Sequence, residues 1–480
     1  MILSEKNRLL KNVIVVSLAF FFEFTAFAGI ANLQSTLNDS AALGTTSLAV
    51  IYGSLVVSSI LLPTVVIKNL GLKYTLMTSL CAYVTYTAAN FYPEYYTLVP
   101  TAIILGLAGA PLWSAKCAYV TTAAQKYAIL TGENEEAVVT KFFGIFFFFF
   151  QNTQIFGNLI SSLILSDVVK TGISFSPAHN SSYILEYCGS KDCNNIDFNA
   201  DDSAKTDKSL VYILMGVYTL TGLLSILFIF IFLDDMKMTE SESTTDKNNS
   251  EALSPWQLCL ATIRHFCNDK RQQTIAFITM YSGFKQAFMT GDFTKSFISC
   301  PLGIGWIGFI LITYGFTDAI CSFSMGRLGG KIGKDTSRGF LIGLAIGLDI
   351  MACTALLLWV PEPVRDDGRP AWLPFFWIPV FWGVSDAVIQ TQINAIYGAF
   401  FVDNQDAAFS NYRLWESIGF ICPFIYQSLL CTSTKLYIQI CVLIVAGFMY
   451  LWCEGINKSL YDKKEESLSL KGQSNDAHID

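Results

Sequence analysis

Residues 13–33 read VIVVSLAFFFEFTAFAGIANL, an apolar stretch interrupted by one acidic residue, Glu23. A helix of about twenty apolar residues can cross the hydrocarbon core of a bilayer, where free backbone groups find no water. The stretch lacks a convincing small-residue cleavage site, so we interpret it as a signal anchor that stays in the chain. It therefore predicts a membrane protein that begins with a spanning helix.

Comparable stretches recur along the whole chain. Of its 480 residues 52% are hydrophobic and only 14% are charged, whereas an average soluble domain has about 25% charged residues. We expect about twelve spans, six on each side of a polar stretch at 234–273. The expected spans are residues 13–33, 46–67, 74–92, 98–120, 141–165, 209–233, 274–294, 303–325, 339–359, 374–397, 410–430 and 434–455.

The distribution of basic residues predicts the orientation of these spans. Three basic residues precede the first span and two follow the second, whereas the outer loops expected at 34–45 and 92–97 contain none. Because short cytoplasmic loops are enriched in Lys and Arg, we expect both termini in the cytoplasm. The long loop at 166–208 then faces outward.

Two features of that loop depend on its outward location. Asn180 begins a glycosylation sequon, and Asn38 begins another in the short first outer loop. Cys188 and Cys193 are the only close cysteine pair in an oxidising compartment, which favours a disulfide between them over two free thiols. We treat both asparagines as glycosylation candidates, with chance occurrence of a sequon as the alternative.

The two halves of the chain resemble each other. Gly291 lies 262 residues after Gly29, and the same shift places residues 154–157 in span five on residues 416–419 in span eleven. Parallel repeats of six spans are typical of the major facilitator architecture. The loop at 326–334 resembles the loop signature of that superfamily, although Gly330 stands where the signature has Asp, which weakens an ordinary transporter mechanism.

The predicted fold is therefore all-α, polytopic and major-facilitator-like. Residues 1–233 form the first six-helix half, with its outer loop at 166–208, and residues 274–455 form the second. A cytoplasmic linker at 234–273 joins the halves, and a polar tail at 456–480 is expected to be disordered.

Charged residues inside spans are costly, so each is a candidate functional residue. The repeat places Glu23 on Lys285, and we expect these two side chains at similar depth on opposing walls of one cavity, where they would pair. Lys116 and Asp386 lie in spans four and ten, which line the same cavity in this architecture. Pairing that holds the halves together and coupling of proton or solute movement are the alternatives.

Further charges lie in the later spans. Arg413 and Glu416 are three residues apart in span eleven and therefore neighbours on one helix face. We expect them to act as a structural clamp rather than as a substrate site. Asp318 and Asp349 interrupt spans eight and nine, and the sequence assigns Asp349 no role.

Three motifs resemble those of the Unc-93 family, in particular its vertebrate homolog A branch. They occupy residues 22–34, 142–162 and 411–420, and the likeness extends along nearly the whole chain. The resemblance implies an accessory protein as much as a transporter. One family member belongs to a potassium-channel complex, and another type escorts nucleic-acid-sensing receptors to endosomes.

The sequence contains no Walker loop, nucleophile elbow or metal triad, and only three His residues. We therefore expect no enzymatic activity, no metal, no cofactor and no nucleic-acid partner. Two functions remain open: an accessory or trafficking partner of another membrane protein, such as a potassium channel, or a secondary transporter of an unknown small solute. The plasma membrane is the expected location, with the endosomal membrane as the alternative.

Overall fold

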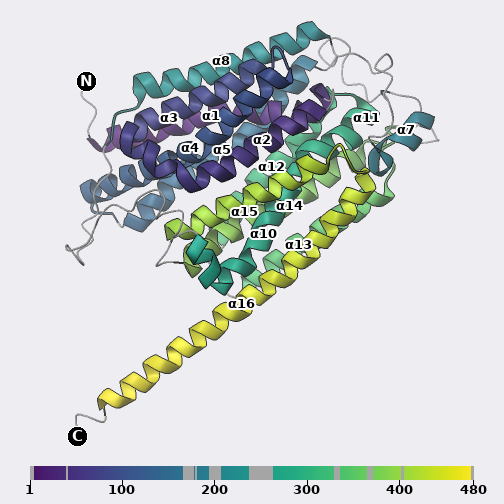
Figure 1. Ribbon diagram of the computed structural model, residues 1–480. Helices are drawn as coiled ribbons and strands as arrows, with labels where there is room; N and C mark the ends of the chain where they lie inside the picture. The colour runs from purple at the N-terminus through teal and green to yellow at the C-terminus, as the bar shows by residue number, and fades with distance from the viewer. Residues whose placement is uncertain are drawn as a thin grey trace.

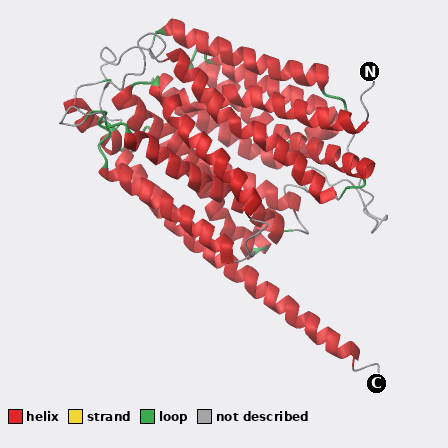
Figure 2. Cartoon of the chain, turned by 180° about the vertical axis from the view of Figure 1, so that it is seen from behind, coloured by secondary structure: helices red, strands yellow, loops and turns green. Residues whose placement is uncertain are grey.

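The computed structural model describes residues 5–38, 42–133, 135–165, 178, 181–193, 207–236, 263–328, 336–364, 371–401 and 405–476. Long helices run side by side in two bundles that follow each other along the chain (Figure 1). The view from behind shows helix in nearly every described segment (Figure 2). Because a helix bonds its own backbone groups, this arrangement suits a hydrocarbon environment.

Five of the six spans expected in the first half each lie on one helix, whereas the span expected at 46–67 covers most of the second helix and the first residues of the third. The Gly71 backbone has φ 75° and kinks the third helix where a loop between spans was expected, because glycine adopts a positive φ without steric cost. The helices are α1 (Glu5–Leu37), α2 (Leu43–Leu61), α3 (Pro63–Ala89), α4 (Tyr95–Thr131), α5 (Glu135–Leu165) and α8 (Lys208–Phe232).

The second half repeats this pattern with one irregular element. Its first helix, α10 (Lys270–Phe288), continues into the π-helical segment η3 (Met289–Ser299) and the short α11 (Cys300–Leu302). The other helices are α12 (Trp306–Leu328), α13 (Thr336–Leu358), α14 (Leu373–Phe400), α15 (Gln405–Tyr426) and α16 (Thr432–Asp476). Between α5 and α8 in sequence, α7 (Ser181–Tyr187) and η2 (Gly189–Lys191) lie at one end of the molecule, which we call the outer end.

Glycines aligned by the repeat occupy equivalent helix crossings. A Cβ atom at Gly157 of α5 would collide with the carbonyl oxygen of Thr25 in α1. A Cβ atom at Gly419 of α15 would collide in the same way with the carbonyl oxygen of Met280 in α10. Glycine is therefore required at both crossings, and each half packs its first helix against its fifth in the same way.

The two halves contact each other mainly through α2 with α15, α5 with α12, and α1 with η3. The rings of Tyr52 and Phe420 stack with their centroids 4.1 Å apart. Toward the outer end, the backbone N–H of Phe309 donates to Ser162 Oγ at 2.9 Å. These contacts join the halves along their facing helices.

Seven of the described helical segments are long and apolar enough to cross a membrane, judged by length and composition alone. Multiple apolar helices of this kind indicate a multi-pass membrane protein. The beginning of α1 and the end of α16 lie at the end of the molecule opposite α7 (Figure 1). The count of twelve spans, the six-plus-six division and the cytoplasmic location of the termini stay predictions.

The expectation of a disordered tail is wrong within the described residues. Helix α16 continues without a break from Thr432 to Asp476 and extends well beyond the bundle (Figure 1). Polar residues without Pro are compatible with helix, and the preceding span supplies the helical nucleus from which the helix propagates. Most of the expected linker, residues 237–262, lies outside the described residues.

Candidate functional site

The clearest concentration of buried charge surrounds Lys285 of α10. Its Nζ lies 3.5 Å from Asp349 Oδ2 of α13 and 3.3 Å from Asp386 Oδ1 of α14. It also donates a hydrogen bond to Ser385 Oγ at 3.2 Å. The three charged side chains are at most 6% exposed. Each buried charge loses its hydration, and attraction to the opposite charge beside it offsets part of that cost.

Two tyrosines complete this cluster. Tyr281 Oη donates to Asp349 Oδ2 at 2.9 Å, and Tyr314 Oη donates to Asp386 Oδ2 at 2.8 Å. With one lysine against two aspartates, the fully ionised cluster carries one net negative charge. Such an arrangement is chemically able to take up a proton or to hold a small cation. The structure therefore gives Asp349, for which the sequence assigned no role, a place beside Lys285 and Asp386.

The expected pairing of Glu23 with Lys285 is wrong. Glu23 is fully buried inside the first half, where Ser225 Oγ of α8 donates to its Oε2 at 3.0 Å. Lys285 instead points toward α13 and α14 of its own half. Both side chains point into the bundle of their own half, so matching positions in a repeat do not make the two charges face each other.

Lys116 of α4 lies among aromatic rings rather than beside a carboxylate. Its Nζ is 4.4 Å from the ring centroid of Phe146 and 5.0 Å from that of Trp113, and its side chain is buried. Phe143 and Phe147 lie slightly farther away. Within the part of the chain that the structure describes, no ion pair joins Lys116 to an acidic residue, and the rings stabilise its charge through their negative faces.

Arg413 and Glu416 form the clamp expected from their spacing. Arg413 Nη1 lies 2.8 Å from Glu416 Oε2, and Tyr412 Oη donates to Glu416 Oε1 at 3.0 Å. The Arg413 guanidinium also lies 5.3 Å from the ring centroid of Trp113 in the other half. Its side chain is 45% exposed, so Arg413, unlike the Lys285 cluster, is open to solvent between the halves.

The expected disulfide between Cys188 and Cys193 is also wrong. Cys188 bonds to Cys300, and Cys193 bonds to Cys431. Proximity in sequence suggested the local pair, but folding brings the loop against Cys300, directly after η3, and Cys431, directly before α16. The pairing depends on tertiary packing that no local spacing reveals.

The structure describes one of the two glycosylation candidates. Asn180 lies outside the described residues. Asn38 is buried, and its Nδ2, the atom that would carry a sugar, donates to Gln34 Oε1 at 2.7 Å and to Asn90 Oδ1 at 3.1 Å. This geometry argues against a glycan at Asn38 in the folded protein.

Sequence reasoning missed one buried ion pair at the outer end. Lys435 Nζ of α16 lies 2.6 Å from Asp292 Oδ1 of η3, and both side chains are at most 3% exposed. Two opposite charges near the outer ends of the seventh and twelfth expected spans were the available signal. Among the described residues, no cluster of three or more His, Cys, Asp or Glu side chains is arranged to hold a metal ion.

Comparison with known proteins places this arrangement in a class. The profile of the family described as "Ion channel regulatory protein UNC-93" matches residues 37–453. The chain therefore belongs to the UNC-93 family, a family of regulatory membrane proteins and not of enzymes, as the sequence motifs suggested.

Individual relatives are similar to this chain over most of its length. The chain is 43% identical to protein unc-93 homolog A of Xenopus laevis over 447 residues, covering 93% of each protein. It is 39% identical to the Homo sapiens protein unc-93 homolog A over 444 residues, covering 92% of this chain and 93% of that protein. A Caenorhabditis elegans relative named "Putative potassium channel regulatory protein unc-93" is 32% identical over 428 residues, covering 87% of this chain and 57% of that protein.

Solved transporter structures share the fold. The xylose transporter XylE of E. coli superposes with a TM-score of 0.58 at 11% identity, covering 93% of this chain and 97% of that one. The nucleoside transporter NupG gives a TM-score of 0.57 at 12% identity, covering 93% and 100%. At this identity the likeness confirms a major-facilitator-like fold and says nothing of substrate.

Proposed function

We propose that this chain acts as a regulatory subunit of another membrane protein, with a potassium channel as the partner. The observation that carries the proposal is the location of the Lys285 cluster. Its ion pairs with Asp349 and Asp386 close within the second half and are almost inaccessible to solvent. The cluster therefore joins four helices of the second half, α10, α12, α13 and α14.

The family supports the same direction. The description of the family is ion channel regulation, and the name of the C. elegans relative specifies a potassium channel. A rigid, multi-helix surface in the plane of the bilayer suits contact with the spanning helices of a partner, where association depends on close packing rather than on hydrophobic burial. The plasma membrane is the compartment in which such a partner would be regulated.

Reconstitution tests this proposal directly. Liposomes that contain a purified potassium channel alone, the chain alone, or both would be compared for potassium flux. We expect a change in flux only when both are present, with a transporter of the same fold, such as XylE, as the control for crowding. Unchanged flux across a panel of potassium channels, together with saturable solute uptake by the chain alone, would reject the regulatory role.

One observation favours a second candidate, solute transport. Arg413 is 45% exposed and lies against Trp113 of the opposite half, and the fold is that of transporters. If the chain transports an anionic solute, Arg413→Lys should retain part of the uptake into liposomes, and Arg413→Gln should abolish it. Absence of saturable uptake by the parent would reject this candidate, and equal uptake by the parent and both variants would reject the role of Arg413.

A further inference from the structure

The outer end of the second half contains an element that needs external support. Segment η3 (Met289–Ser299) is π-helical over 11 residues, whereas π-helices are rare and usually occur as single-turn bulges at functional sites. A change between π and α geometry would rotate its side chains relative to their partners. The side chains of η3 therefore need contacts that fix their direction.

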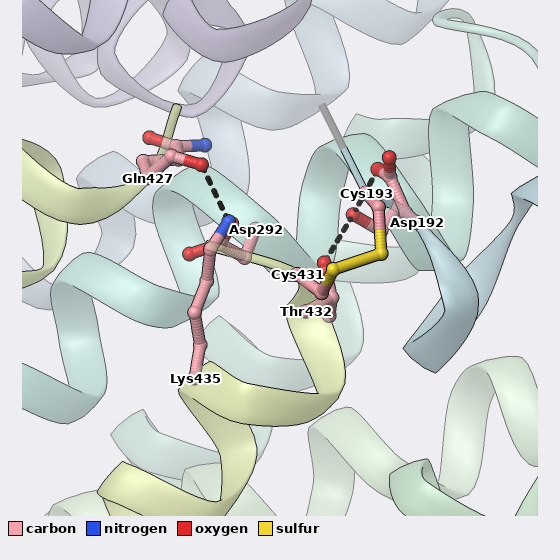
Figure 3. The surroundings of a disulfide bond; sticks show 8 residues. Asp192, Cys193, Asp292, Gln427, Cys431, Thr432 and Lys435 are labelled. Atoms are coloured by element: carbon pink, nitrogen blue, oxygen red, sulfur yellow. Dashed lines mark hydrogen bonds and ion pairs between the residues drawn. A yellow bond between two sulfur atoms is a disulfide. The ribbon is translucent and has the colours of Figure 1, made fainter. Parts of the chain in front are cut away.

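Polar contacts to α16 supply part of that support. Lys435 Nζ lies 2.6 Å from Asp292 Oδ1 and donates to the carbonyl oxygen of Gln427 at 2.6 Å. Four residues farther along η3, Ser296 Oγ lies 3.2 Å from Thr432 Oγ1. Both contacts lie on the side of η3 that faces the beginning of α16, and Figure 3 shows how Lys435 reaches Asp292 and Gln427.

The loop segment at 188–193 adds covalent support. Cys300, directly after η3, bonds to Cys188, and Cys431, directly before α16, bonds to Cys193. Residues 188–193 thus connect the end of η3 to the beginning of α16. The sequence separations of 112 and 238 residues show that neither link follows from local chain connectivity.

Residues 188–193 also form hydrogen bonds with the elements around them. Ser296 Oγ donates to Asp192 Oδ2 at 2.6 Å, and the backbone N–H of Thr432 donates to the Asp192 carbonyl oxygen at 2.9 Å. Gly189 has φ +71°, and a Cβ atom there would lie 2.7 Å from Pro361 Cδ. The segment therefore touches η3, α16 and the connection after α13, and Asp192 is hydrogen-bonded to both η3 and α16. Figure 3 shows Asp192 beside the Cys193–Cys431 disulfide and Thr432.

The first half is held through η3. Ser35 Oγ of α1 and Thr294 Oγ1 of η3 are 3.2 Å apart, and both side chains are buried. Thr294 lies between Asp292 and Ser296, the two η3 residues that are held from the other side. A rotation of η3 would break the contact with α1 together with those to α16.

We propose that residues 188–193 form a covalent strap that keeps η3 in its π-helical register against α16 and so holds the outer ends of the two halves closed. This inference does not depend on the regulatory function proposed above. With the strap intact, η3, α11 and the beginning of α16 move as one body. Separation of the halves at the outer end requires that body to rearrange.

Hydrogen–deuterium exchange of the full chain in lipid nanodiscs tests the strap. Opening both disulfides, with the changes Cys188→Ser, Cys193→Ser, Cys300→Ser and Cys431→Ser combined, should speed exchange of the η3 amides about tenfold or more, because local opening becomes easier. Wild-type protein reduced after purification with a phosphine, with the four thiols confirmed by mass spectrometry, gives the same comparison without a folding requirement. Unchanged η3 exchange after confirmed opening would overturn the proposal.

Matched changes separate the strap from general loosening. Cys81→Ser with Cys441→Ser removes two free, exposed thiols, one from each half, and should leave η3 exchange unaltered. Thr294→Cys places a thiol at a site that is fully buried. It should react with an impermeant maleimide faster in the four-serine background than with the strap intact, and equal rates in the two backgrounds would overturn the role in closure.

Discussion

The two halves of this protein share a backbone plan but stabilise their interiors by different chemistry. The second half pairs most of its buried charges, Lys285 with two aspartates and Lys435 with Asp292. Its Asp318 instead accepts a hydrogen bond from Ser322. In the first half, Glu23 has one hydrogen-bond partner, Ser225, and Lys116 lies among aromatic rings. The second half also receives both disulfides.

This difference shows what an internal repeat preserves. Gly157 and Gly419 are equivalent in position and in function, because a close helix crossing depends only on the backbone. Glu23 and Lys285 are equivalent in position only, since each side chain is satisfied by neighbours in its own half. The second half should therefore be sensitive to loss of a charge, and the first half should tolerate it.

Among the substitutions that only remove a charge, the largest effect is expected for Lys285→Met. The substitution leaves Asp349 and Asp386 buried without their cation, and breaking a buried pair by removing one partner costs about 3–5 kcal/mol. The midpoint of thermal unfolding, measured on purified protein in one detergent, should fall sharply.

The matched control removes all three charges at once. Lys285→Met combined with Asp349→Asn and Asp386→Asn keeps side chains of similar size and leaves no buried ion unpaired, so most of the lost stability should return. A triple variant as unstable as Lys285→Met would show that the cluster does not act through charge pairing.

A smaller loss is expected for Lys435→Met at the outer end. It leaves one carboxylate, Asp292, without its cation, and the expected cost is about 3 kcal/mol, the lower end of the range for a broken buried pair. The double variant Asp292→Asn with Lys435→Met should recover part of the loss. If Lys435→Met proves more harmful than Lys285→Met in the same unfolding assay, the number of unpaired carboxylates is not what ranks the two sites.

Much of the fold was predictable because hydrophobicity and helix length depend on local sequence. The expected spans coincide with helices, and Arg413 and Glu416 pair as their spacing on one helix face requires. The disulfides and the partners of Glu23 depend instead on which way each helix is rotated. That rotation is set by packing contacts such as Gly222 against Glu23, which have no signature in a single sequence.

Lys116→Met should have a modest effect on the stability of the first half. It removes cation–π contacts worth about 2 kcal/mol when desolvated, but it also removes the cost of holding a charge away from water. We expect a net loss of about 1 kcal/mol in the free energy of unfolding, and a smaller loss for Lys116→Arg, which keeps the charge over Phe146 and Trp113. A loss as large as that of Lys435→Met would reveal an acidic partner.

The smallest effect is expected at Glu23. Gln keeps an oxygen that can accept the hydrogen bond from Ser225, and the Ser225 hydroxyl has a second acceptor in the Gly222 carbonyl at 2.8 Å. Glu23→Gln should therefore change the free energy of unfolding by no more than about 1 kcal/mol, the net value of one hydrogen bond. This result would separate Glu23 from Lys285, although the repeat aligns them.

Exchange of the two charges makes the contrast sharper. If Glu23 and Lys285 formed a pair, Glu23→Lys combined with Lys285→Glu would restore it. In the structure, Lys at position 23 would lie beside Gly222, with no carboxylate partner among the described residues, and Glu at position 285 would lie beside Asp349 and Asp386. Because each substitution destabilises its own site and the two sites are independent, the losses in the free energy of unfolding should add. We therefore expect the double variant to unfold at a lower temperature than either single variant. An unfolding temperature that returns toward that of the parent would instead support a pair between Glu23 and Lys285.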